Sequence, residues 1–153
     1  VYGLQAAYLK EVVDASKKKT LMIGAGGVSP SVILSLQKSG VNEISIVNRT
    51  KEKCIFYQKK FKNLKILDWN KLKDEIKNYD IIINATSLGL KKTDRLPFDV
   101  TNSPLNSVIA DIIMQPEETE LLKNAKSLGR SVHYGKYMIK SQIDLVNDFL
   151  KIW

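Results

Sequence analysis

The sequence predicts an α/β protein of the Rossmann-like, doubly wound type, with a mostly parallel six-stranded sheet and helices on both faces. Short apolar runs rich in β-branched residues recur along the chain, and helical patterns separate them. Continuous apolarity indicates strands that are covered on both faces, as in a parallel sheet. In addition, a glycine-rich turn joins the first run to a helical pattern, as in a nucleotide-binding βαβ unit.

Six runs are expected to form the strands: residues 21–23, 44–47, 65–67, 81–83, 108–110 and 131–133. Strands that alternate with helices favour right-handed crossovers and therefore a single doubly wound sheet. The sequence shows no internal repeat and no low-complexity linker, so we expect one domain over residues 1–153.

Helices are expected where apolar residues recur with helical spacing: residues 4–15, 30–39, 51–60, 119–127 and 137–153. The second of these opens with Pro30, which suits a first helical turn, and stops at Gly40. The fourth ends shortly before Gly129, another plausible terminator. Residues 91–104 are polar and contain two prolines, which predicts a long loop on the functional edge of the sheet.

The size and composition of the chain are those of about one soluble globular domain, with 153 residues, 44% hydrophobic and 26% charged. No apolar run approaches the ~20 residues that span a bilayer, and the first residues lack the apolar segment of a signal peptide. The single cysteine, Cys54, excludes an internal disulfide, is interpreted as helix packing and fits a reducing cytoplasm. We expect a cytoplasmic protein without a membrane partner.

The net charge of +8 favours an anionic partner, either nucleic acid or a phosphorylated small molecule. The lysines are scattered, however, and the longest run, residues 17–19, is interpreted as a solvated helix end. The sequence contains neither a zinc-ligand spacing nor an aromatic and basic ribonucleoprotein motif. We therefore predict no nucleic-acid partner and no metal.

The glycine-rich turn stands between the first predicted strand and the first helix that follows it, and consists of Gly24, Ala25, Gly26, Gly27, Val28 and Ser29. Glycines suit such a turn because backbone N–H groups must approach a pyrophosphate that a side chain would block. The helix N-terminus adds partial positive charge. In this context the pattern predicts a nucleotide site rather than an ordinary tight turn.

The second predicted strand ends in Asn48, Arg49 and Thr50, where a ribose-binding acid is usual. A carboxylate would repel a 2′-phosphate, whereas a guanidinium can bind it through two hydrogen bonds. Lys53 follows one helical turn after Thr50. The alternative is that Thr50 caps the helix and Arg49 is solvated, although capping and binding do not exclude one another. The residues favour NADP over NAD.

Asp111 and His133, the single histidine, end two predicted strands. Asp111 has no basic neighbour in the sequence, so we expect a loop-bracing role. His133 is expected to have no catalytic duty, because no Ser-His-Asp or paired-carboxylate arrangement emerges.

Five stretches, GAGGVSPSV, NRTKEK, DIIINATSLGL, DIIMQPEETELL and GKYMIKSQ, occur in the order and spacing of the shikimate dehydrogenase family, and the resemblance covers essentially the whole chain. The first two stretches also resemble glutamyl-tRNA reductase, whereas the third and the last favour shikimate dehydrogenase. The resemblance implies an NADP-dependent oxidoreductase of the shikimate pathway. Such an enzyme reversibly reduces 3-dehydroshikimate to shikimate with NADPH in aromatic amino-acid biosynthesis.

The resemblance also implies roles for single residues. It places the pyrophosphate at residues 24–29 and the 2′-phosphate and adenosine at Asn48, Arg49, Thr50 and Lys53. The further contacts that it implies are Ala85, Thr86, Ser87, Ile112 and Gly135 for the cofactor, and Gln142 and Met114 for the substrate. From the residues alone, the Thr86–Ser87 pair could be a polar strand end, and Gln142 an exposed helix residue.

Three positions depart from the family pattern. Met114 stands where the family often has a tyrosine, which removes a hydroxyl from the substrate side. Tyr137 stands where a small residue is common, and Pro30 replaces a frequently basic residue while preserving the helix start.

Members of the family carry an N-terminal substrate-binding domain, with a lysine for proton transfer and an aspartate that orients the substrate. The sequence matches the family from the position after that aspartate, so residues 1–18 are expected to be the linking helix from that domain, and residues 137–153 the C-terminal helix. Both catalytic residues are then expected upstream of Val1, and none in this chain, which alone should lack turnover. Family members are monomers or homodimers.

Two other functions remain open at this point. One is a quinate/shikimate dehydrogenase domain, and the other is a stand-alone NADP-binding module that regulates a partner. Arg49 argues against the NAD-preferring quinate enzymes, but it does not identify the polyol. An upstream reading frame for the substrate domain would exclude the stand-alone module.

Overall fold

The protein is described by a computed structural model, which covers residues 17–137 of the chain. The expected helix at residues 4–15 and Gln142 lie outside the described residues. So do nearly all of the segments 1–18 and 137–153 that we expect to form the linking and C-terminal helices. Among residues 17–137, no helix has the length and apolarity that crossing a membrane requires.

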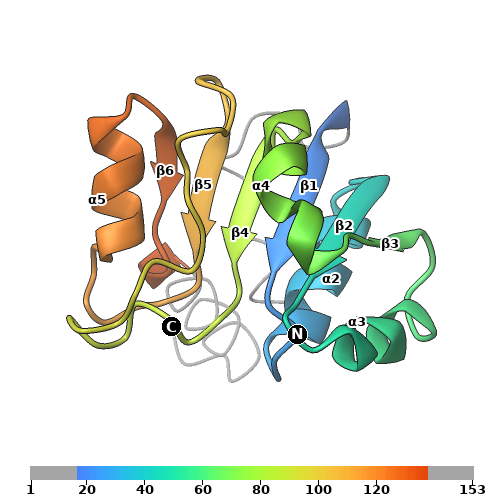
Figure 1. The fold of residues 1–153 in the computed structure, drawn as a ribbon. Helices are drawn as coiled ribbons and strands as arrows, with labels where there is room; N and C mark the ends of the chain where they lie inside the picture. Colours follow the sequence, from blue (N-terminus) through green and yellow to red (C-terminus); the bar gives the residue numbers. More distant parts are fainter. Residues whose placement is uncertain (1–16, 138–153) are drawn as a thin grey trace, which may run out of the picture.

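One sheet of six strands forms the centre of the fold (Figure 1). The strands are β1 (Lys19–Ile23), β2 (Glu43–Val47), β3 (Leu64–Ile66), β4 (Ile81–Asn84), β5 (Val108–Asp111) and β6 (Ser131–His133). Their order is β3-β2-β1-β4-β5-β6, and every neighbouring pair is parallel. The six predicted strands and the Rossmann-like fold are therefore confirmed, and the sheet is wholly parallel.

The helices are α2 (Ser29–Lys38), α3 (Lys51–Gln58), α4 (Leu72–Glu75) and α5 (Glu120–Ser127). Single 3₁₀ turns, η2 (Trp69–Lys71) and η3 (Ile76–Asn78), flank α4. This helical segment was not predicted from the sequence, because it is short and buries only two side chains, Leu72 and Ile76. The other three helices agree with their predicted ranges within two residues.

The helices lie on both faces of the sheet because successive strand side chains point to opposite sides. Leu21 and Ile23 of β1 belong to one buried cluster, and Met22 between them belongs to the other. The Met22 cluster contains side chains of α2 and α3, whereas the Leu21 cluster contains side chains of α4 and α5 (Figure 1). Side chains on both faces of β1 are thus buried, which explains why its sequence is continuously apolar.

Single residues set the ends of these helices. Thr119 precedes α5, and its hydroxyl accepts a hydrogen bond from the backbone N–H of Leu122 at 3.4 Å. Gly40 and Gly129, which follow α2 and α5, have φ angles of +83° and +79°, in the region that favours glycine. Cys54 of α3 is buried, and burial raises the pKa of its thiol to about 11, in agreement with a packing role.

The connection from β4 to β5, residues 85–107, contains no helix, and we call it the strap. It begins at the carboxyl edge of the sheet, as predicted, and then crosses one face, where Phe98 and Val100 are buried in the same cluster as Leu21. Arg130, just before β6, holds its far end. The guanidinium donates hydrogen bonds to the Thr101 carbonyl at 2.9 Å and to the Ser103 carbonyl at 2.7 Å. The strap therefore does the covering that a crossover helix usually does.

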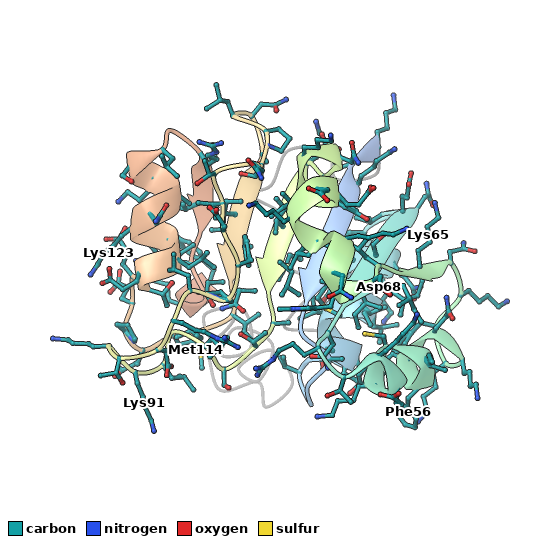
Figure 2. The ribbon with its side chains drawn as sticks, viewed as in Figure 1. Phe56, Lys65, Asp68, Lys91, Met114 and Lys123 are labelled. Atoms are coloured by element: carbon teal, nitrogen blue, oxygen red, sulfur yellow. The ribbon has the colours of Figure 1, made fainter. Side chains whose placement is uncertain are left out.

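The charged side chains lie mainly on the outside of this core, as Figure 2 shows for Lys65 and Lys123. The Nζ atom of Lys65 is 3.1 Å from Glu43, and that of Lys123 is 2.6 Å from Glu120. Exposed pairs of this kind contribute little to stability, so they are not what holds the fold together.

Candidate cofactor-binding site

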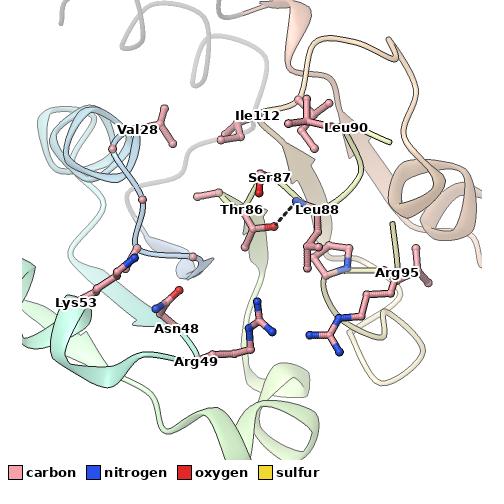
Figure 3. A pocket seen from close by; sticks show the side chains of 18 of the residues that line it. Val28, Asn48, Arg49, Lys53, Thr86, Ser87, Leu88, Leu90, Arg95 and Ile112 are labelled. Atoms are coloured by element: carbon pink, nitrogen blue, oxygen red, sulfur yellow. Dashed lines mark hydrogen bonds between the residues drawn. The ribbon is translucent and has the colours of Figure 1, made fainter. Parts of the chain in front are cut away.

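A pocket of about 1040 Å³ opens at the carboxyl edge of the sheet, where the turns after β1, β2, β4 and β5 meet. Strands β1 and β4 are neighbours, and the chain continues from them in opposite directions across the sheet. Ligands of open α/β sheets bind at such a switch point, outside the carboxyl ends of the strands. Figure 3 shows Val28, Asn48, Thr86 and Ile112 around this space.

Gly24 lets the turn after β1 lie directly against the end of β4. Its φ angle is +111°, and a Cβ atom at this position would be 2.7 Å from the carbonyl oxygen of Ala85. The Gly24 N–H donates to the Val47 carbonyl at 2.8 Å, and the Ala85 N–H donates to the Ile23 carbonyl at 2.7 Å. A glycine is therefore required here by the packing of three strand ends, before any ligand is considered.

Gly26 and Gly27 form the open part of the same turn. At Gly27 an added Cβ atom would meet no described atom within 4 Å, and at Gly26 the nearest would be 3.9 Å away. The turn is braced from behind by Tyr57 of α3, whose hydroxyl donates to the Gly26 carbonyl at 2.9 Å. It leads into α2, which has no acidic residue in its first turn, so the positive end of the helix dipole is not neutralised there. This arrangement suits a phosphate.

The segment after β2 brings two cations to the pocket. Arg49 and Lys53 both line it and both are exposed, while the Asn48 side chain donates to the Thr50 carbonyl at 3.0 Å and shapes the turn between them. Thr50 occupies the N-cap position of α3, but its hydroxyl makes no capping hydrogen bond, and Thr50 is not part of the pocket wall.

The wall on the side of β4 is held by Asn84. Its Oδ1 atom accepts hydrogen bonds from the N–H and the hydroxyl of Thr86, at 3.1 and 2.7 Å. Its amide group donates to the Leu88 carbonyl at 3.2 Å. The Thr86 hydroxyl in turn accepts from the Leu88 N–H at 3.1 Å (Figure 3). Thr86 and Ser87 are thus fixed at the pocket by a buried amide, rather than being a loose polar strand end.

Asp111 fixes the wall that follows β5. The residue is fully buried, and its carboxylate accepts hydrogen bonds from the Ile113 N–H at 3.0 Å, the Asn84 amide at 3.1 Å and the Thr119 hydroxyl at 2.7 Å. Burial raises the pKa of Asp111, while these hydrogen bonds act in the opposite direction. The predicted loop-bracing role of Asp111 is confirmed.

Gly135, after β6, supports the same wall from behind. A Cβ atom there would lie 2.7 Å from the carbonyl oxygen of Ile112 and would also overlap that of Ile113. Ile112 is half-buried, and Met114, whose side chain is 40% exposed, ends the pocket on this side. His133 is buried in β6, and its ring centroid lies 5.2 Å from that of Tyr137, outside the pocket wall.

Among residues 17–137, most of the predicted site residues thus line one pocket, but three do not. Ser29 is buried, and its N–H and hydroxyl donate to the carbonyls of Gly26 and Gly24, so it braces the turn. Thr50 and Gly135 also stand outside the wall, for the reasons given above.

Several residues that line the pocket were not predicted from the sequence. They are Trp69, Leu88, Leu90, Arg95, Leu96, Pro97, Ile113 and Gln115. The strap supplies most of them. Their sequence signal was the polar stretch at residues 91–104, which predicted a functional loop without showing which side chains face the site.

Three cationic side chains, Arg49, Lys53 and Arg95, line the pocket, and no carboxylate is among the described residues that do so. A concave site lined by one sign of charge attracts ligands of the opposite sign. Together with the open glycine turn, it can hold an elongated polyanion. The described wall also contains no histidine, and Lys53 is its one lysine.

Comparisons with known proteins point to one family. The model of the family "Shikimate / quinate 5-dehydrogenase" matches residues 7–104. The NADP(+)-dependent shikimate dehydrogenase of Pelagibacter ubique is 36% identical over 138 residues, covering 90% of this chain and 51% of that protein. The chain spans about half the length of the curated relatives it matches.

Solved structures give the same result. A shikimate dehydrogenase from Aquifex aeolicus superposes with a TM-score of 0.80 at 35% identity, covering 90% of this chain and 50% of that one. The Thermus thermophilus shikimate 5-dehydrogenase in complex with NADP(H) and shikimate has a TM-score of 0.78 at 26% identity, with 92% and 51% coverage.

Proposed function

The chain belongs to the shikimate / quinate 5-dehydrogenase family, and from this premise we propose that it is the NADP-binding domain of a shikimate dehydrogenase. One observation carries the choice of cofactor. Arg49 and Lys53 line the pocket at the end of β2, where sheets that bind NAD carry a ribose-binding acid. A carboxylate would repel the 2′-phosphate of NADP, whereas these cations attract it.

The residues present fit such a dinucleotide along the whole pocket. The open glycine turn and the N-terminus of α2 suit the pyrophosphate, because the turn leaves space at Gly27 and carries no acid. Arg49 and Lys53 suit the adenosine end. Ile112 and Met114, on the far side of Thr86, form an apolar end that suits the nicotinamide.

When bound, NADPH supplies the hydride that reduces the carbonyl carbon of 3-dehydroshikimate, a reaction of the shikimate pathway in aromatic amino-acid biosynthesis. The residues of this chain contribute binding and orientation, since correct placement of two reactants is itself a large part of catalysis. We assign proton transfer to residues outside 17–137, because the described pocket wall has neither a carboxylate nor a histidine and we place its one lysine, Lys53, at the adenosine end. The isolated chain is then expected to bind the cofactor without turnover.

Calorimetric titration of the 153-residue chain with NADP and with NAD tests the proposal. We expect NADP to bind more tightly, and the preference to fall by about tenfold or more in Arg49→Ala, because a charge-assisted hydrogen bond contributes roughly 1.5–3 kcal/mol. Equal affinities for the two cofactors, unchanged in the variant, would refute the NADP assignment. For the whole protein, steady-state rates with shikimate and with quinate then decide between the two substrates that the family description names.

The remaining assignments follow from the same proposal. We assign the protein to the cytoplasm, with a small-molecule substrate bound together with a further domain, and to a monomeric or homodimeric state. Sedimentation of the whole protein measures the last of these directly.

A further inference from the structure

Arg95 is a second arginine at the pocket, and it comes from a different element than Arg49. It lies on the strap, at the opposite side of the pocket from the end of β2. In Figure 3 the two side chains project into the pocket from opposite walls, with their guanidinium groups turned toward one another. Within residues 17–137, neither guanidinium has a hydrogen bond or an ion pair with the protein.

The backbone at Arg95 is anchored on both sides. On one side, the Asp94 carboxylate accepts hydrogen bonds from the N–H groups of Gly89 and Lys91 at 3.1 and 3.0 Å, which closes a tight loop. These two hydrogen bonds hold the pKa of Asp94 below its ordinary value. On the other side, Pro97 and Phe98 are buried. The arginine is thus presented to the pocket by a fixed stretch of chain, while its own side chain is exposed.

The charges around Arg95 call for an anion. The two guanidinium groups carry like charge and line the same pocket, so they repel one another, and the Lys53 ammonium adds a third positive charge to that pocket. The nearest acid in the sequence, Asp94, does not line the pocket and is engaged by backbone N–H groups. An anion bound between the two arginines would relieve this repulsion and would gain hydrogen bonds from both.

We propose that Arg95 is a specificity-determining residue, which binds the 2′-phosphate of the cofactor together with Arg49. The inference rests on the proposed NADP-binding function. A phosphate monoester carries close to two negative charges and three acceptor oxygens, enough for two planar guanidinium groups on opposite sides. The pyrophosphate is a poorer candidate, because its expected place is the glycine turn before α2, whereas Arg95 is turned toward the end of β2.

The test measures four probes on four forms of the 153-residue chain by calorimetry. The probes are NADP, NAD, 2′,5′-ADP and 5′-AMP, so that each pair differs in the 2′-phosphate alone. The forms are the wild type, Arg95→Gln, Arg95→Lys and Lys91→Gln. Lys91 is the matched control, because it lies on the same loop, is not part of the pocket wall and projects away from the molecule (Figure 2).

Arg95→Gln is expected to lower the affinity for NADP and 2′,5′-ADP by about tenfold, and to change the affinity for NAD and 5′-AMP by less than about twofold. The affinities of Arg95→Lys for NADP and 2′,5′-ADP should lie between those of the wild type and Arg95→Gln, since lysine keeps the charge but lacks the planar guanidinium. Lys91→Gln should leave all four affinities unchanged. Because Arg95 is exposed, circular dichroism is expected to show the same fold for every form.

Two results would overturn the inference while leaving the proposed function intact. If the wild type prefers NADP, and Arg95→Gln weakens NADP and NAD equally, the arginine contacts a part common to both cofactors. If Arg95→Gln changes nothing, the side chain is solvated. A wild-type chain that shows no preference for NADP would instead overturn the proposed function, and this inference with it.

Discussion

The hydroxyl of Thr119 donates a 2.7 Å hydrogen bond to the carboxylate of Asp111, and both residues are fully buried. The same hydroxyl accepts the N–H of Leu122, so one threonine both caps α5 and binds the acid at the end of β5. Asp111 in turn holds the Ile113 N–H and the Asn84 amide. A single chain of hydrogen bonds therefore links the end of β4, the pocket wall after β5 and the start of α5.

The pH dependence of stability should report on this acid. Because burial raises the folded-state pKa of Asp111 above the unfolded value of about 3.9, its contribution is fully present below that value and is lost as pH rises through the folded pKa. Asparagine does not ionise, so Asp111→Asn does not lose this contribution. As pH rises from the unfolded to the folded pKa, the free energy of unfolding of the variant should therefore increase relative to that of the wild type. Urea denaturation at a series of pH values measures it.

Asp94 supplies a control of opposite sign. Backbone hydrogen bonds lower its folded-state pKa, so its contribution is present above the unfolded pKa and is lost as pH falls through the folded one. The free energy of unfolding of the wild type should therefore increase relative to that of Asp94→Asn as pH rises. Parallel pH profiles for the wild type and Asp111→Asn would contradict the assignment of a raised pKa to Asp111.

Gly24 and Gly27 should respond differently to alanine. At Gly24 the φ angle of +111° and the Ala85 carbonyl oxygen oppose a Cβ atom, so Gly24→Ala should lower the free energy of unfolding by roughly 2–4 kcal/mol. At Gly27 a Cβ atom enters open space, so Gly27→Ala should cost less than about 1 kcal/mol but should weaken NADP binding. Thermal unfolding and calorimetry on both variants separate the two roles. A Gly27→Ala chain that binds NADP like the wild type would show that the turn does not approach the phosphates.

Arg130 should contribute to stability, although it does not line the pocket. Its guanidinium bonds to Leu128, Thr101 and Ser103, and three of these four hydrogen bonds join the strap. Arg130→Ala should reduce the free energy of unfolding by about 1–3 kcal/mol and speed hydrogen exchange in the strap. Lys91 is a cation on the strap itself, and its side chain makes no such hydrogen bonds among the described residues. Lys91→Ala should therefore change the free energy of unfolding by less than about 0.5 kcal/mol. Equal effects of the two substitutions would show that the strap is held by its apolar side chains alone.

The fold was predictable because its signals are local. Short runs that contain β-branched or other apolar residues marked all six strands, most clearly β1 and β4, and Pro30, Gly40 and Gly129 marked helix ends. The helical segment around Leu72 was not predicted, because it is divided into short turns and buries only two side chains, although Asp68 caps its start by accepting a hydrogen bond from the Asn70 N–H at 3.1 Å. Its place is decided by the second face of the sheet, which needs a cover that the local sequence does not reveal.

The site was predictable in part, for a similar reason. Residues that directly follow a strand, such as Arg49 and Thr86, reach the carboxyl edge whatever the rest of the chain does. Arg95 does not follow a strand, and it reaches the pocket because Asp94 and Phe98 fix the path of the strap. The opposite case is Ser29, which belongs to the glycine turn in sequence but turns its polar atoms inward.

The strap has a consequence for how this site can evolve. A crossover helix packs against the core along its whole length, so a substitution or insertion in it shifts the side chains that pack on the sheet. The strap separates the two tasks, since Phe98 and Val100 pack against the sheet while Leu88, Leu90 and residues 95–97 line the pocket. Insertions or substitutions in that bordering stretch can therefore change which cofactor is accepted while the sheet and its helices stay as they are.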